Sequence, residues 1–198
     1  MLERIPAGSR EDGAEADAAR RHAGIKRREC NHLLSDWLNV YIRDAAKLKT
    51  FEPDPAALSY LLGGIAPLTH MQRSLRFLLR EGFLRRTLTG QVVQDEPLVT
   101  STDDLPSAKI RAFHKKALAL AARAIAALPA DQRRQSAMIM HLNGDSVNEL
   151  KEILKGFHER LMQFAEDRPD ENETLYQVII NLTPISLPMP PARDLPSP

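Results

Sequence analysis

Hydrophobic residues recur at helical spacing in three successive segments in the first half of the chain. The spacing predicts helices over 31–48, over 56–62 and from Thr69 to about Gly82. Thr69 is a good N-cap for the third helix, and Gly82 supplies a C-terminal stop. The predicted order is therefore helix, helix, turn, helix.

A β-hairpin is predicted directly behind the third helix. Residues 83–87 have strand-like composition, Thr89-Gly90 can form the turn, and Val92-Val93 can return as the second strand. A helix that leads straight into a short hairpin is the order of a winged helix. Together with the two helices before it, this pattern predicts a winged helix-turn-helix domain over residues 30–97.

The pattern after residue 106 predicts a helix-strand-helix-strand domain over residues 107–187. A long helix is expected over 107–128, followed by an apolar run of strand length at 137–142. Ser146 and Glu149 have capping-box spacing and would open a second helix that ends near Arg168. Residues 175–186 are apolar and β-branched, and we expect them to pair with 137–142. Such a domain suits dimerisation or signal input.

The remaining segments lack the pattern of packed structure. Residues 1–29 hold few large apolar side chains, which predicts a disordered or loosely helical tail. Residues 98–106 read as a linker, and 188–198 as a proline-rich tail. The predicted fold class is therefore α+β and mainly helical.

Positive charge is concentrated in the third helix and the hairpin. Residues 69–94 hold five arginines and one glutamate, a local charge of +4, whereas the whole chain carries +1. Residues 144–173 hold nine acidic and four basic residues, so that part should face away from DNA. Guanidinium groups bridge phosphates and pair with guanine, and glutamine suits adenine.

These residue types predict a DNA-binding surface; the competing interpretation is a basic helix face that only meets solvent. We expect bases or adjacent phosphates to be contacted by Thr69, His70, Gln72, Arg73 and Arg76. We expect the DNA backbone to be held by Arg80, Arg85, Arg86 and Gln91.

Other functional classes find little support. The sequence has no GxSxG, HExxH, Walker or GxGxxG motif, so neither an enzyme nor a cofactor is expected. His114, His141 and His158 form no i, i+4 ligand pair and are expected to be separate residues, with no metal site. The single cysteine, Cys30, and the polar N-terminus favour a reducing cytoplasm. No apolar run is long enough for a membrane span, so no membrane partner is expected.

Several segments resemble a bacterial family catalogued as domain of unknown function 4423. The matching text spans about residues 40–187 and comprises AFHKKALALAARAIAALP, DQRRQSAMIMHL, LKEILKGFHERLMQFAED and LYQVIINLTPIS. Members of that family resemble transcriptional regulators, and many carry a Cro-like helix-turn-helix upstream. Here the first 29 residues are too polar to supply that module, so the internal winged helix would carry DNA binding alone.

A second resemblance is confined to about 25 residues. SLRFLLREGFLRRTLTGQ is similar to the recognition helix and wing of repressors of the ArsR and MarR kind. The sequence thus predicts a cytoplasmic transcriptional regulator that binds double-stranded DNA as a homodimer. The alternative is a protein-interaction or dimerisation module of a regulatory complex, with a protein partner and without DNA binding of its own.

Overall fold

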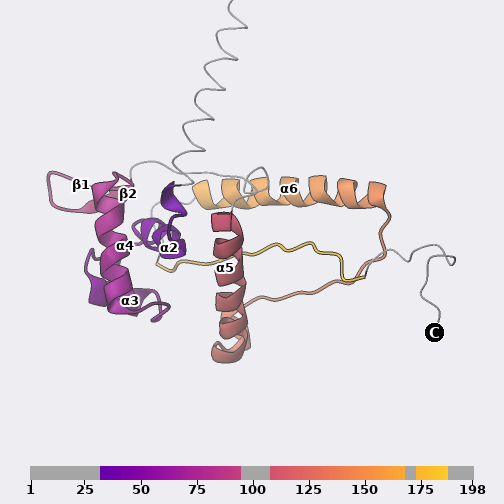
Figure 1. The fold of residues 1–198 in the computed structure, drawn as a ribbon, viewed down its shortest axis with the longest axis horizontal. Coiled ribbons are helices and arrows are strands. Elements are labelled where there is room, and N and C mark those ends of the chain that lie inside the picture. The colour runs from indigo at the N-terminus through magenta and orange to yellow at the C-terminus, as the bar shows by residue number, and fades with distance from the viewer. Residues whose placement is uncertain (1–31, 95–107, 168–172, 187–198) are drawn as a thin grey trace, which may run out of the picture.

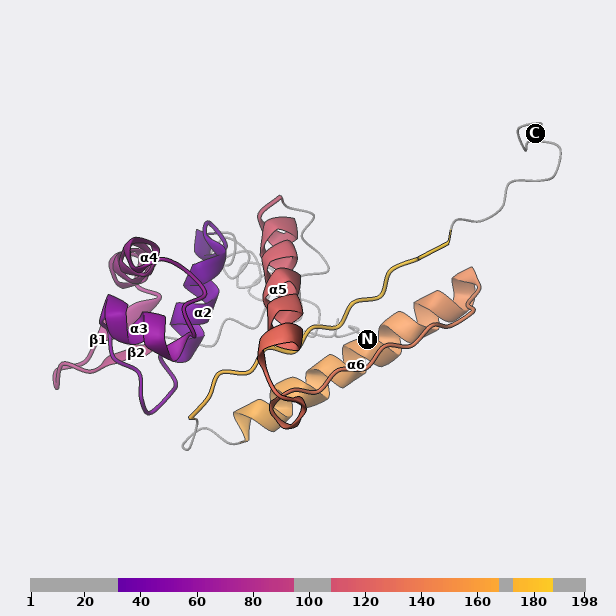
Figure 2. The same cartoon turned by 90° about the horizontal axis from the view of Figure 1, so that it is seen from below.

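The computed structural model describes residues 32–94, 108–167 and 173–186. Within these ranges the fold is α+β and mainly helical, and its sheet is a single two-stranded hairpin. Helices α2, α3 and α4 form one group with the hairpin, and α5 stands beside α2 (Figures 1 and 2). The segments predicted as the N-terminal tail, the linker and the C-terminal tail lie outside the described residues.

The start predicted for the first helix is wrong, because the backbone is extended at Asp36 and a new helix begins after it. Helix α2 spans Trp37–Ala45, and Asp36 precedes it with the extended angles φ −141° and ψ 132°. The Asp36 carboxylate accepts a hydrogen bond from the Leu38 N–H at 3.1 Å. An aspartate that caps the following turn satisfies donors that an unbroken helix would leave to the backbone, which favours a new helix start.

Helix α3 spans Pro55–Leu61 and confirms its prediction to within one residue. The Asp54 carboxylate accepts from the N–H groups of Ala56 and Ala57, at 2.8 and 3.0 Å. Helix α4 spans Leu68–Arg80 and follows Pro67, so the prediction of Thr69 as its N-cap was wrong. The Pro67 carbonyl already accepts from the His70 and Met71 N–H groups, which places the helix start before Thr69.

The three helices share one hydrophobic core. Met71, Leu75 and Leu78 of α4 are buried together with Leu38 and Ile42 of α2. Full burial of a leucine, isoleucine or methionine side chain stabilises a fold by roughly 1.5–3 kcal/mol. The core therefore fixes the rotation of α4 and leaves the opposite face of that helix outside.

The predicted hairpin is confirmed. Strand β1 spans Leu84–Arg86 and pairs antiparallel with β2, Val92–Gln94, with Leu84 opposite Gln94. Gly90 adopts φ +83° in the connecting turn, and its N–H donates to the Thr87 carbonyl at 3.0 Å. Gly82, with φ +78°, turns the chain from α4 into β1, as expected for a glycine just after a helix.

Helices α5 and α6 make up the second half. Helix α5 spans Ala108–Ala127 as predicted, and a short 3₁₀ helix, η3, follows at Ala130–Gln132. Ile110 of α5 is buried against Leu34. Helix α6 spans Gly144–Glu166 and begins earlier than predicted, because Asn143 is the N-cap and its Oδ1 accepts from the Ser146 N–H at 2.8 Å.

The two strands predicted at 137–142 and 175–186 are absent as strands. Both segments are extended, but among the described residues neither joins a β-ladder. They run in the same direction in both views (Figures 1 and 2). Apolar and β-branched composition favours extended backbone, but a ladder also needs a paired neighbouring strand, which the described part of the chain does not place there.

Candidate nucleic-acid interface

The outer face of α4 brings together most of the residues predicted to read DNA. Thr69, Gln72, Arg73, Arg76 and Arg80 are exposed, and His70 is half-buried. Buried side chains at spacings of three and four residues hold this orientation, since they occupy the opposite side of the helix; they are Met71, Ser74, Leu75 and Leu78. Three arginines therefore share one solvent-facing side of a single helix.

Two of these residues are anchored to the carboxylate of Asp36. His70 Nε2 lies 2.6 Å from Asp36 Oδ2, and Arg73 Nη2 donates to the same oxygen at 3.1 Å. Burial alone would raise the pKa of Asp36, but the hydrogen bonds from Leu38 N–H, His70 and Arg73 and the charge of His70 together lower it. Asp36 stays ionised and positions the first turns of α4.

Arg80 is held at the other end of α4. Its Nε donates to Glu81 Oε1 at 2.6 Å, and its guanidinium carbon lies 5.8 Å from the centre of the Phe77 ring. Glu81 also pairs with His32 Nε2 at 2.9 Å, and the hydrogen bonds from His32 and Arg80 lower the pKa of the Glu81 carboxyl. Arg80 is thus charge-paired at the helix end.

Arg76 differs from both neighbours. Within the described ranges the structure shows no carboxylate in ion-pair distance of its guanidinium, although the side chain is exposed. An unpaired guanidinium on an outward helix face keeps its full charge and all five donors for an incoming anion. Arg76 is therefore the centre of the candidate interface.

The hairpin presents two more arginines and Gln91, all exposed. Arg85 and Arg86 are consecutive in β1, so their side chains leave opposite faces of the hairpin. Arg86 shares its face with the buried Leu84 and with its cross-strand neighbour Val92. Arg85 and Arg86 are consequently not brought together, and a single phosphate cannot engage both through the same face.

Arg43 is a structural residue that the sequence analysis did not identify. It is 3% exposed on α2, and its Nη1 lies 3.3 Å from Asp44 Oδ1. With the Gln94 amide oxygen turned toward it, Arg43 Nε donates to that oxygen at 3.0 Å. This contact attaches the end of β2 to α2, so the hairpin has a fixed position relative to the helices.

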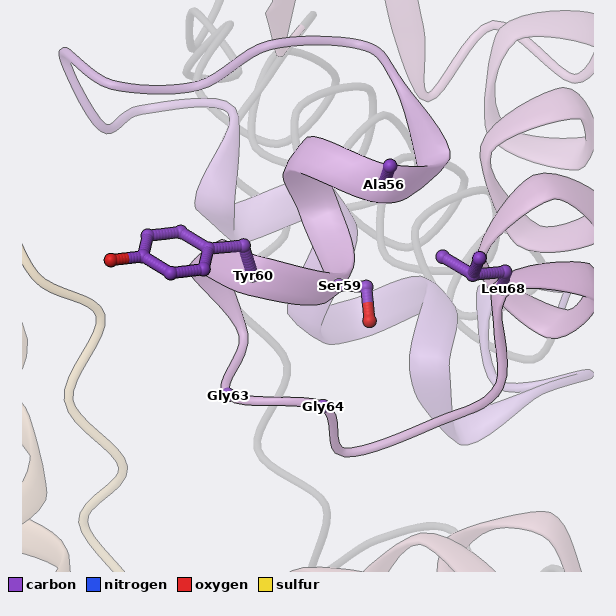
Figure 3. A pocket seen from close by; sticks show the side chains of 6 residues that line it. All are labelled: Ala56, Ser59, Tyr60, Gly63, Gly64 and Leu68. Atoms are coloured by element: carbon purple, nitrogen blue, oxygen red, sulfur yellow. The ribbon is translucent and has the colours of Figure 1, made fainter.

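Other parts of the described chain hold fewer features that could bind a ligand or carry out a reaction. No cluster of three metal-ligating side chains occurs among the described residues, and no helix there is long and apolar enough to cross a membrane. A shallow hollow lies between α3 and the start of α4, bordered by Ser59, Gly63 and Leu68, while the Tyr60 ring extends away from it (Figure 3). Its lining includes no aspartate, glutamate, lysine, arginine or histidine.

Comparison with known proteins places the chain by family alone. No curated protein and no solved structure matches it. The model of a family described as a domain of unknown function, DUF4423, matches residues 18–185, which is most of the sequence. The chain therefore belongs to the DUF4423 family.

Proposed function

We propose that this protein is a cytoplasmic DNA-binding transcriptional regulator in which α2, α3, α4 and the hairpin act as a winged helix-turn-helix. The observation that carries the proposal is the division of α4 into a buried apolar side and an exposed side with three arginines. A recognition helix needs this division, because one side must be fixed by the core while the other enters the major groove.

The contacts suggest different roles along α4. Arg76, without an ion pair in the described part of the chain, is suited to a phosphate or to a guanine edge. Gln72 lies one turn earlier and is suited to adenine. Arg73 is restrained by Asp36, so its guanidinium is pre-oriented but partly neutralised. Arg80 and Arg86 would hold the backbone at the helix end and at the wing.

A homodimer would present two α4 helices to half-sites about one DNA turn, roughly 34 Å, apart. Binding should be strongly salt-dependent, because each phosphate contact releases condensed counterions. Asp36 and Glu81 offset part of the arginine charge, so a measurable complex is expected only at low salt unless the sequence is specific.

The test is capture of fragments from a mixed genomic pool at low salt. The parent should retain fragments, and the double variant Arg73→Ala/Arg76→Ala should lose them. Arg123→Ala is the matched control, because Arg123 is an exposed arginine on α5, outside the proposed interface. Failure of the parent to bind any fragment, or equal binding by the double variant, contradicts the proposal.

The second candidate function is a protein-interaction or dimerisation module without DNA binding. One observation favours it: large apolar side chains are exposed along α6 and both extended segments. Contiguous exposed apolar surface is typical of association sites. The same capture experiment discriminates the two functions, since an interaction module retains no DNA while still forming its complex.

A further inference from the structure

Helix α6 carries a regular apolar seam that the described part of the chain covers only in part. The seam residues are spaced alternately by three and four positions; they are Val147, Leu150, Leu154, Phe157, Leu161 and Phe164. This is the a/d spacing of a coiled-coil heptad, which forms when a second helix supplies complementary knobs and holes. None of the 23 residues of α6 is fully buried; Phe157 is 42% exposed and Phe164 is exposed, while the other four seam residues are half-buried.

The two extended segments are also incomplete. Residues 135–143 and 174–186 contain no Asp, Glu, Lys or Arg, and the second segment is apolar on both faces. One face carries the half-buried Leu175 and Ile179 together with Gln177 and Asn181, and the other carries the exposed Tyr176, Val178 and Ile180. An uncharged extended segment with apolar side chains on both faces is typical of a covered, paired strand, and left open it promotes aggregation.

These features lie in one part of the molecule. Of the eighteen large apolar side chains that are exposed in the described structure, twelve belong to residues 138–185. The α2–α4 group, by contrast, has its own core. The exposed apolar surface is therefore concentrated on α6 and the two extended segments. We call the α6 seam together with these two segments the C-terminal face.

We propose that the C-terminal face binds the same face of a second copy of this chain, with the α6 seams packed together and the extended segments paired between copies. A second copy fits because it supplies both complements at once, a heptad-spaced helix and uncharged extended backbone. Two-fold related surfaces of this kind are self-complementary. The inference deepens the homodimer of the proposed function and rests on that part alone.

The C-terminal face is tied to the α2–α4 group by Gln177. The Gln177 side-chain amide donates to the Ala117 carbonyl of α5 at 3.1 Å, and its oxygen accepts from the Tyr41 hydroxyl of α2. Tyr41 in turn lies against Phe113 of α5, with ring centres 6.0 Å apart. Association through the C-terminal face would therefore set the separation of the two α4 helices through α5 and α2.

The test compares two aspartate substitutions in the same helix. Sedimentation equilibrium of the full chain without DNA, from sub-micromolar to high micromolar concentration, should show a dimer. Phe157→Asp, in the seam, should weaken the dimer at least about 30-fold, as loss of a central apolar contact does. Lys155→Asp is the control, because it places an aspartate on the exposed side of α6 outside the seam and changes the net charge by more than Phe157→Asp does. Circular dichroism and Trp37 fluorescence check that both variants stay folded.

Hydrogen exchange completes the test. Amides of 138–142 and 176–183 should exchange more slowly as the dimer forms. A monomer at all concentrations, or equal weakening by both variants, overturns the inference. Protection in a monomer also overturns it, because the segments then pair within one copy. A dimer that binds no DNA refutes the regulator but not this inference, whereas a monomer that binds DNA refutes this inference and the proposed homodimer but not DNA binding by α4.

Discussion

His70 Nε2 lies 2.6 Å from Asp36 Oδ2, which joins the first turn of α4 to the residue that caps α2. Asp36 thus has two functions: its Oδ1 caps the Leu38 N–H, and its Oδ2 receives His70 and Arg73. The angle at which α4 presents its outer face depends on this single carboxylate as well as on the apolar core.

Acidification should weaken the fold through Asp36. Because the folded pKa of Asp36 lies below the ordinary aspartate value of 3.8, the stabilisation is complete above pH 3.8 and is lost as the pH falls through the folded pKa. Asp36→Asn keeps a capping oxygen but cannot ionise, so its free energy of unfolding should depend less on pH in this range. Urea denaturation followed by Trp37 fluorescence measures the free energy of unfolding of the parent and of Asp36→Asn at each pH. If the two free energies fall in parallel as the pH is lowered, Asp36 contributes nothing to the pH dependence.

Alkaline pH should destabilise the fold through ionisation of Tyr41. Burial raises the pKa of the Tyr41 phenol to about 12, from 10.0. The unfolded chain therefore loses this proton first, and stability contributed by the neutral phenol declines as the pH rises above 10.0. Tyrosinate absorbance should show a late ionisation step that Tyr41→Phe removes. Persistence of that step in Tyr41→Phe would assign it to another tyrosine.

Two glycine substitutions should change stability in opposite directions. Gly82 has φ +78°, where a Cβ is strained whatever the space, so Gly82→Ala should cost about 1–2 kcal/mol. Gly156 lies inside α6 with open space around its Cα, so Gly156→Ala should stabilise by about 0.5–1 kcal/mol. Thermal unfolding measures both shifts, and a stabilising Gly82→Ala would contradict the left-handed turn after α4.

On the buried side of α4, substituting an apolar residue and substituting a polar residue should have different effects on stability. The Ser74 hydroxyl is buried and finds no hydrogen-bond partner among the described residues, so Ser74→Ala should be neutral or stabilise by up to about 1 kcal/mol. Leu78→Ala on the same side leaves a cavity and should cost about 2–5 kcal/mol. Equal costs for the two variants, measured by urea denaturation, would mean that Ser74 has a partner in solution.

Periodicity predicted the elements whose stability comes from local spacing and core burial. The helices at 56–62 and 107–128 and the hairpin were predicted within one or two residues, because each combines a clear apolar pattern with glycine or proline boundaries. Helix starts were less accurate at Asp36, Pro67 and Asn143. At each of these positions the helix starts after a capping side chain or a proline, while the sequence offers another plausible N-cap residue a few positions away.

Contacts between distant residues could not be predicted from spacing. The arginines of α4 were placed on its exposed side, but Asp36 lies 34 residues before His70, and nothing in the local pattern links the two. The strands at 137–142 and 175–186 show the complementary failure. Their composition indicates a preference for extended backbone, whereas pairing depends on a neighbouring strand that the described residues do not provide.

The most direct test of the account is the salt dependence of DNA binding by Arg76→Ala. Fluorescence anisotropy with a captured fragment, from 50 to 200 mM salt, should give a slope of log affinity against log salt that is shallower than the parent's by about one for each α4 helix bound. Arg123→Ala should keep the parent's slope. An unchanged slope for Arg76→Ala, or the same change in both variants, would contradict DNA recognition by the outer face of α4.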